Sequence, residues 1–132
     1  MSTPLNLLIV DDIFVNRLLI KEIVKKINAK CFEAENGKQA VDIHLNEKID
    51  LILMDIEMPV MNGLETTKYI REKVPHPKNN IPIIALTAHN PATFFEDFKD
   101  VGFNQLMTKP YSIDQVLKVI EEFFPSNKTL PY

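Results

Sequence analysis

Carboxylates, a hydroxyl and an ammonium group follow four short apolar runs of this sequence. Asp11 and Asp12 come directly after LNLLIV, and Asp55 follows LILM. Thr87 follows IIAL, and Lys109 follows NQLMT. Oxygen ligands without sulfur or clustered histidine favour a hard divalent cation such as Mg²⁺ over zinc. The same set can do phosphoryl chemistry, because a carboxylate can accept a phosphoryl group while lysine and hydroxyl groups stabilise its oxygens.

The charge of this set also favours a cation. Three carboxylates and one lysine sum to about −2 if all ionise, and like charges at close range raise one another's pKa. A divalent cation would bring the sum to about zero. Asp11 and Asp12 are adjacent and suited to hold the metal, whereas Asp55 stands alone on the central apolar run. We therefore expect Asp55 to be the phosphoryl acceptor.

The elements that must position these groups alternate along the chain. Apolar runs at 5–10, 30–34, 51–54, 83–86 and 104–108 are separated by segments of helix length. The nearly continuous Leu, Ile and Val runs are typical of strands buried on both faces of a parallel sheet. The alternation predicts an α/β sheet with right-handed crossovers. In such sheets, ligands bind outside the carboxyl ends of the strands, where the chemical groups are expected here.

Helix boundaries carry their own signals. Asn36 with Gln39, Asn62 with Glu65 and Ser112 with Gln115 resemble capping boxes, Asn90-Pro91 predicts a helix start, and Gly102 predicts the end of that helix. The helix expected over 13–27 has two neighbouring apolar stripes. One contains Val15, Leu18, Leu19 and Ile23, and the other contains Ile20, Val24 and Ile27.

Length and composition exclude several classes of protein. The 132 residues, 45% apolar and 25% charged, fit one domain, expected over 5–124 with a tail or linker over 125–132. A net charge of −3 without a basic stripe argues against nucleic-acid or membrane-surface binding. A single cysteine, Cys31, and the absence of a signal-peptide pattern favour a reduced, cytoplasmic compartment.

Taken together, the motifs resemble those of the receiver domain of two-component response regulators, over roughly residues 6–124. The matching elements are Asp11-Asp12 with Asn16-Arg17, Asn36-Gly37, the block MDIEMPVMNG over 54–63, Thr87-Ala88 and Lys109-Pro110. The sequence of that block is similar to the corresponding sequences in receivers of hybrid kinases. The resemblance implies a doubly wound, flavodoxin-like fold, with a five-stranded parallel sheet of order 2-1-3-4-5 flanked by five helices.

The resemblance also implies a function and roles for the site. Asp55 would take a phosphoryl group from a histidine kinase or a histidine phosphotransfer protein. Asp12 would bind Mg²⁺ directly and Asp11 through water, with Asp55 and the main-chain carbonyl of Glu57 as further ligands. Thr87 would move toward the phosphoryl group. Output would then pass to a downstream protein target by binding, from a monomer or weak homodimer.

Two further expectations concern the residues around the fifth apolar run, 104–108. The resemblance implies that the peptide bond between Lys109 and Pro110 is cis. Lys109 would contact the phosphoryl group. The family often has an aromatic residue three positions before this lysine, but Leu106 stands there. The resemblance therefore does not imply that an aromatic side chain at position 106 packs against Thr87 as it moves. Phosphorylation is still implied.

Two other classes remain as alternatives. The first is a small phosphatase with an aspartate nucleophile, acting on a diffusible phosphoester, in which Glu57 has the offset of an acid/base group. No segment, however, is long enough to form a cap over such a site. The second is a module that binds a nucleotide or flavin, and the three unclustered glycines argue against a glycine-rich phosphate loop.

Overall fold

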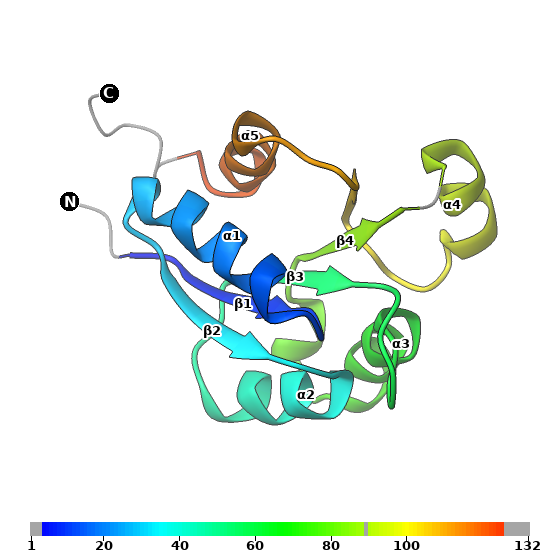
Figure 1. The fold of residues 1–132 in the computed structure, drawn as a ribbon. Helices are drawn as coiled ribbons and strands as arrows, with labels where there is room; N and C mark the ends of the chain where they lie inside the picture. Colours follow the sequence, from blue (N-terminus) through cyan, green and yellow to red (C-terminus); the bar gives the residue numbers. More distant parts are fainter. Residues whose placement is uncertain (1–3, 89, 126–132) are drawn as a thin grey trace.

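A five-stranded parallel sheet forms the centre of the molecule (Figure 1). The computed structural model describes residues 4–88 and 90–125, so most of the predicted tail lies outside the described residues. The strands are β1 (Asn6–Val10), β2 (Lys30–Ala34), β3 (Leu51–Asp55), β4 (Ile83–Thr87) and β5 (Gln105–Thr108). Their order is β2-β1-β3-β4-β5, with every pair parallel. The predicted sheet order is confirmed.

Helices connect the strands and cover the sheet. They are α1 (Phe14–Val24), α2 (Gly37–Asn46), α3 (Gly63–Lys73), α4 (Pro91–Phe98) and α5 (Ile113–Phe123), with the short 3₁₀ helices η1 (Lys25–Ile27) and η2 (Lys78–Asn80). Helices α1 and α5 lie side by side on one face, and α2 and α3 on the other (Figure 1). Within residues 4–88 and 90–125, no helix has both the length and the apolar character needed to cross a bilayer.

The central strand β3 feeds both halves of the core. Its residues Leu51 and Leu53 join the cluster under α1 and α5, whereas Ile52 and Met54 join the cluster over α2 and α3. All five residues of the strand are buried. Alternating side chains reach opposite faces of a strand, so a strand covered on both sides is apolar throughout. This burial holds the end of β3, and with it Asp55, in a fixed position.

The stripe of Ile20, Val24 and Ile27 faces the sheet, and of the other stripe of α1 only Ile23 does. Ile20, Ile23 and Val24 are buried. By contrast, Val15 is 67% exposed and Leu19 50% exposed, although both have the spacing of a core stripe. Leu18 of the same stripe and the preceding Ile13 and Phe14 are also exposed. We call these five exposed residues, 13–15 and 18–19, the α1 patch.

The predicted helix caps are present, but α4 is shorter than expected. The side chains of Asn36, Asn62 and Ser112 accept hydrogen bonds from the third backbone N–H of α2, α3 and α5. Helix α4 ends at Phe98, so the prediction that Gly102 ends it is wrong. Gly102, with φ of 114°, instead forms a turn before β5. Its carbonyl accepts hydrogen bonds from Arg71, whose Nε lies 3.0 Å away.

Candidate functional site

Four strand ends bring the predicted chemical groups to one edge of the sheet. Asp55 is the last residue of β3, and Thr87 is the last residue of β4. The apolar runs had indicated that each directly follows its strand. Asp11 follows β1, and Lys109 follows β5. Because these parallel strands are neighbours, their carboxyl ends meet.

Three carboxylates converge at this edge. One oxygen from each of Asp11, Asp12 and Asp55 lies within 4.8 Å of the other two. Asp11 and Asp55 are buried, and Asp12 is exposed. Oδ1 of Asp11 accepts a hydrogen bond of 2.9 Å from the main-chain N–H of Ile13, but its buried Oδ2 has no hydrogen-bond partner among the described residues. A buried carboxylate oxygen in this state is costly without a cation, so the three side chains fit a hard divalent ion.

Lys109 is the cation of the site. Its Nζ donates to Oδ1 of Asp55 at 2.9 Å and lies 4.0 Å from Oδ2 of Asp11. Its main-chain N–H donates to the carbonyl of Thr87 at 2.8 Å, which ties the end of β5 to β4. The bond between Lys109 and Pro110 is cis, as predicted. The amino group is thus held against the expected acceptor carboxylate.

The environment shifts the pKa values of both partners. Burial raises the pKa of Asp55 to about 6, as do the charges of Asp11 and Glu57, whereas Lys109 opposes the rise. Burial lowers the pKa of Lys109, but the hydrogen bond to Asp55 and the neighbouring carboxylates outweigh this and raise it overall. Lys109 therefore stays charged at neutral pH, and Asp55 is ionised there.

The side chain of Glu57 binds the end of β4. Its Oε2 accepts a hydrogen bond of 3.1 Å from the hydroxyl of Thr87, and its Oε1 accepts one of 3.4 Å from the main-chain N–H of Ala88. Thr87 is buried, and Glu57 is exposed. The resemblance assigns only the main-chain carbonyl of Glu57 to the site. The structure therefore adds a carboxylate that occupies two hydrogen-bond donors beside Asp55.

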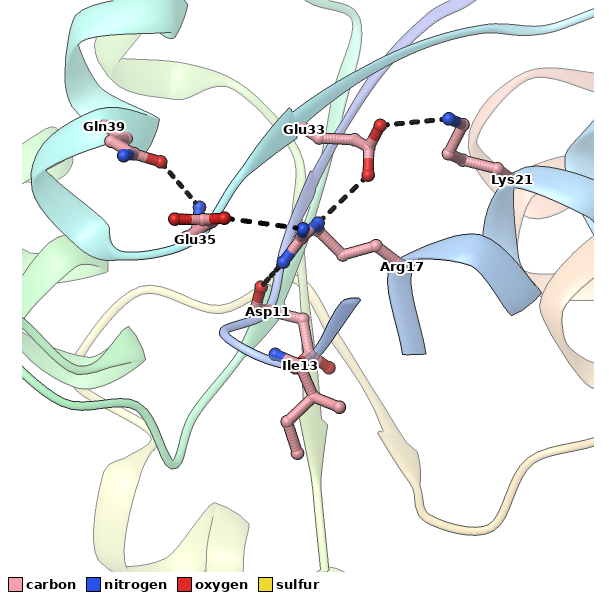
Figure 2. Close-up of polar contacts among 7 residues, drawn as sticks. All are labelled: Asp11, Ile13, Arg17, Lys21, Glu33, Glu35 and Gln39. Atoms are coloured by element: carbon pink, nitrogen blue, oxygen red, sulfur yellow. Dashed lines mark hydrogen bonds and ion pairs between the residues drawn. The ribbon is translucent and has the colours of Figure 1, made fainter. Parts of the chain in front are cut away.

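Arg17 joins Asp11 of the acidic edge to Glu33 and Glu35 (Figure 2). Its Nη1 donates to the main-chain carbonyl of Asp11 at 2.7 Å, and its Nε donates to Oε1 of Glu33 at 3.0 Å. Lys21 binds the other oxygen of Glu33 at 3.0 Å, and Glu35 lies 3.7 Å from Nη2 of Arg17. These bonds fix the turn after β1, from which Asp11 projects, to the end of β2.

The role of Arg17 was not predicted from the sequence. One signal for its burial exists, because Arg17 lies three and seven residues before Ile20 and Val24, on the stripe that packs on the sheet. A charge on an apolar stripe needs a partner within the protein. The sequence does not identify that partner, because Glu33 lies on strand β2 and not on the helix of Arg17.

Gly63 allows α3 to start directly against the site. A Cβ at this position would collide with the main-chain carbonyl of Asp55 and with the Cα of Ile56. The N–H of Gly63 donates to the carbonyl of Ile56 at 3.0 Å, and the capping box of Asn62 and Glu65 starts the helix. The close approach fixes the end of β3 against α3.

Leu106 stands where the family often has an aromatic residue. It is partly buried and packs on a small cluster formed by Ile56, Ala85 and Phe94. The aromatic side chains of this cluster come from α4, through Phe94 and Phe98, and from Phe103 in the segment before β5. Phe94 is buried, and its ring centroid lies 5.1 Å from that of Phe98 and 5.7 Å from that of Phe103.

Comparisons with known proteins agree on one family. The model of the response regulator receiver domain matches residues 7–121. Sporulation initiation phosphotransferase F of Bacillus subtilis is 35% identical over 119 residues, which cover 90% of this chain and 93% of that protein. The structure of the chemotaxis response regulator CheY4 of Vibrio cholerae is similar with a TM-score of 0.84 and 25% identity, covering 92% of this chain and 100% of that one.

A second solved structure concerns the metal. The receiver domain of a sensor histidine kinase from Pseudomonas aeruginosa PAO1 is similar with a TM-score of 0.81 and 27% identity, covering 92% of this chain and 98% of that one. It is described with a magnesium ion coordinated in its active-site cleft.

Proposed function

The chain belongs to the response regulator receiver domain family, and from this premise we propose that Asp55 is its phosphoryl acceptor. Membership makes it a phosphoacceptor module of two-component signalling rather than a catalytic enzyme, so the phosphatase alternative is set aside. The observation that carries the assignment is the buried Asp55, bonded to Lys109 at 2.9 Å and grouped with Asp11 and Asp12.

The three carboxylates form an acidic triad typical of Mg²⁺-binding receiver sites. For this chain, we propose that Asp11, Asp12 and Asp55 hold Mg²⁺, with the main-chain carbonyl of Glu57 as a further ligand. The buried Oδ2 of Asp11, which accepts no hydrogen bond from the described residues, supports this proposal. When bound, Mg²⁺ supplies positive charge to the phosphoryl oxygens.

The donor is a phosphohistidine on a histidine kinase or phosphotransfer protein. An oxygen of Asp55 bonds to phosphorus while the phosphorus–nitrogen bond of the donor breaks, and the imidazole nitrogen keeps its electron pair. Lys109 neutralises one phosphoryl oxygen, and the hydroxyl of Thr87 donates to another. The pKa of Asp55 is about 6, so its side chain is mainly ionised at neutral pH. The ionised carboxylate is the form that attacks phosphorus.

The α1 patch supports docking of this donor beside Asp55. It borders a hollow of about 220 Å³ lined by Asn16, Leu19, Lys109, Pro110 and Tyr111. Lys109 thus contacts both the hollow and the acceptor carboxylate. An apolar surface of this kind is a typical interaction site, and a partner bound there would place its histidine at the acidic edge.

Phosphorylation would pull Thr87 toward Asp55 and change the surface built by β4, α4 and β5. A downstream protein target would read that change by binding. Leu106 of β5 packs against the cluster that contains Phe94 of α4, so a shift of Thr87 would be transmitted through this cluster.

Intact mass spectrometry tests the acceptor. Incubation with Mg²⁺ and acetyl phosphate should add one phosphoryl group, which hydroxylamine removes because an acyl phosphate is labile to it. Asp55→Asn should abolish the addition. The control is Asp50→Asn, since Asp50 precedes β3 at the opposite edge of the sheet, where it accepts a hydrogen bond from the N–H of Asn6. Labelling that persists in Asp55→Asn would refute the assignment.

A further inference from the structure

The carboxylate of Glu57 lies on two donors that a phosphoryl group on Asp55 would need. Its two oxygens accept from the hydroxyl of Thr87 at 3.1 Å and from the N–H of Ala88 at 3.4 Å. Both donors lie at the end of β4, whose Leu86 pairs with Asp55 on the neighbouring strand. A carboxylate and a phosphoryl group are both anions with paired oxygens, so they compete for the same donors.

We propose that Glu57 is an internal competitor of the phosphoryl group, holding Thr87 and Ala88 in the unphosphorylated protein. The inference rests on the proposed phosphorylation of Asp55. On phosphorylation, the phosphoryl oxygens displace the Glu57 carboxylate, which turns outward into solvent. Glu57 is exposed, so the displaced side chain needs no rearrangement of the core.

Competition has a defined consequence for affinity. Each anion bound at the acceptor site must break the hydrogen bonds that Glu57 makes to Thr87 and Ala88, and it must accept the repulsion of a nearby carboxylate. The charge of Glu57 already reaches Asp55, because it contributes to the raised pKa of that carboxyl. Removing the Glu57 side chain should therefore strengthen binding of a phosphoryl analogue, while the main-chain carbonyl of residue 57 stays in place.

Two substitutions separate occupancy of the donors from charge. Glu57→Ala removes both. Glu57→Asp keeps the charge but is one methylene shorter, so it falls short of Thr87 and Ala88. Binding of beryllofluoride, an inorganic phosphoryl analogue, is measured by fluorine NMR in Mg²⁺. Glu57→Asp should bind it about tenfold more tightly than the parent protein, the effect of releasing donors from a charged acceptor. Glu57→Ala should bind it at least as tightly as Glu57→Asp, because it also removes the repelling charge.

A double-mutant cycle and a charge control complete the design. In a Thr87→Val background, Glu57 has lost one of its donors, so the gain from Glu57→Ala should be smaller than in the parent protein. Glu72→Ala removes an exposed carboxylate in the last turn of α3, away from the strand ends, and should leave affinity unchanged. Thermal unfolding of each variant verifies that it is folded.

The outcomes are distinct. If the parent protein binds no beryllofluoride and takes no phosphoryl group from acetyl phosphate, the proposed function fails. If the parent protein binds but Glu57→Ala is no tighter, or Glu57→Asp matches the parent, Glu57 does not compete for the donors. An undiminished gain in the Thr87→Val background would overturn the inference in the same way.

Discussion

The amino group of Lys109 lies 2.9 Å from Oδ1 of Asp55 and 4.0 Å from Oδ2 of Asp11. One cation therefore serves two carboxylates that are both buried. A bound Mg²⁺ and Lys109 would repel each other, whereas a phosphoryl group is attracted to both. The same lysine thus opposes the metal and favours the phosphoryl group.

Lys109→Met should change these two properties in opposite directions. Removing the cation should tighten Mg²⁺ binding by about 1 kcal/mol, because a like charge leaves the site. It should slow phosphorylation by acetyl phosphate about tenfold or more, because the positive charge that stabilises the transferred phosphoryl group is lost. Calorimetry and intact mass measure the two effects. Lys25→Met, at a side chain 67% exposed, is the control and should alter neither. Weaker Mg²⁺ binding in Lys109→Met would contradict the electrostatic argument.

Arg17 should be worth more to stability than Lys21, although both bind Glu33. The Arg17 side chain is only 7% exposed, and its loss leaves the carbonyl of Asp11 and one oxygen of Glu33 without their donor. Arg17→Met should lower the free energy of unfolding by about 3 kcal/mol. The Lys21 side chain is 34% exposed, and Lys21→Met should cost less than about 1 kcal/mol. Urea unfolding compares them, and equal losses would show that Arg17 acts as a surface charge.

The convergence of Asp11, Asp55 and Lys109 could be predicted from the sequence, because it follows from topology. Parallel strands place their carboxyl ends at one edge, so a residue's position after an apolar run was sufficient to locate it. The burial of α1 could not be predicted in the same way. Two apolar stripes share the helical period, and only packing on the sheet shows that Ile20 is buried and Val15 exposed.

The contact between Glu57 and Thr87 also could not be predicted. It joins side chains thirty positions apart in sequence through a loop conformation that no periodicity encodes. The end of α4 was predicted at Gly102, but the helix ends at Phe98, because the glycine serves a tertiary contact. The left-handed φ of Gly102 serves a turn held by Arg71 of α3, rather than the helix end that a glycine usually indicates.

His44 should make stability depend on pH. It is 1% exposed, and burial lowers its pKa below 6.5. Its Nε2 donates to the carbonyl of Lys78 at 2.8 Å, which leaves Nδ1 buried without a partner in the described structure. Because the folded pKa is below the unfolded one, the unfolded state binds more protons at low pH. The contribution of neutral His44 to the free energy of unfolding is therefore complete above pH 6.5. It declines as the pH falls below 6.5, by at most about 1.4 kcal/mol per pH unit.

Urea unfolding between pH 7.5 and 5 measures this loss by comparison with His44→Gln, which cannot take up a proton. Asp55 acts in the opposite direction over part of this range, because its folded pKa is raised to about 6. The difference in slope between the two proteins cancels that contribution, since both contain Asp55. Parallel pH profiles for the parent and His44→Gln would rule out the role of His44.

Val60, in the loop between β3 and α3, should be replaceable with a gain in stability. Its φ of 71° lies in the left-handed region, which is unfavourable for a β-branched residue, and its side chain is 83% exposed. Val60→Asn should raise the free energy of unfolding by up to about 1 kcal/mol, because asparagine tolerates this conformation and little packing is lost. Val60→Ala is the matched control, since alanine keeps the Cβ that causes the strain and should gain less. Urea unfolding ranks the three proteins, and a destabilised Val60→Asn would mean that the valine side chain contributes more by contact than its backbone conformation costs.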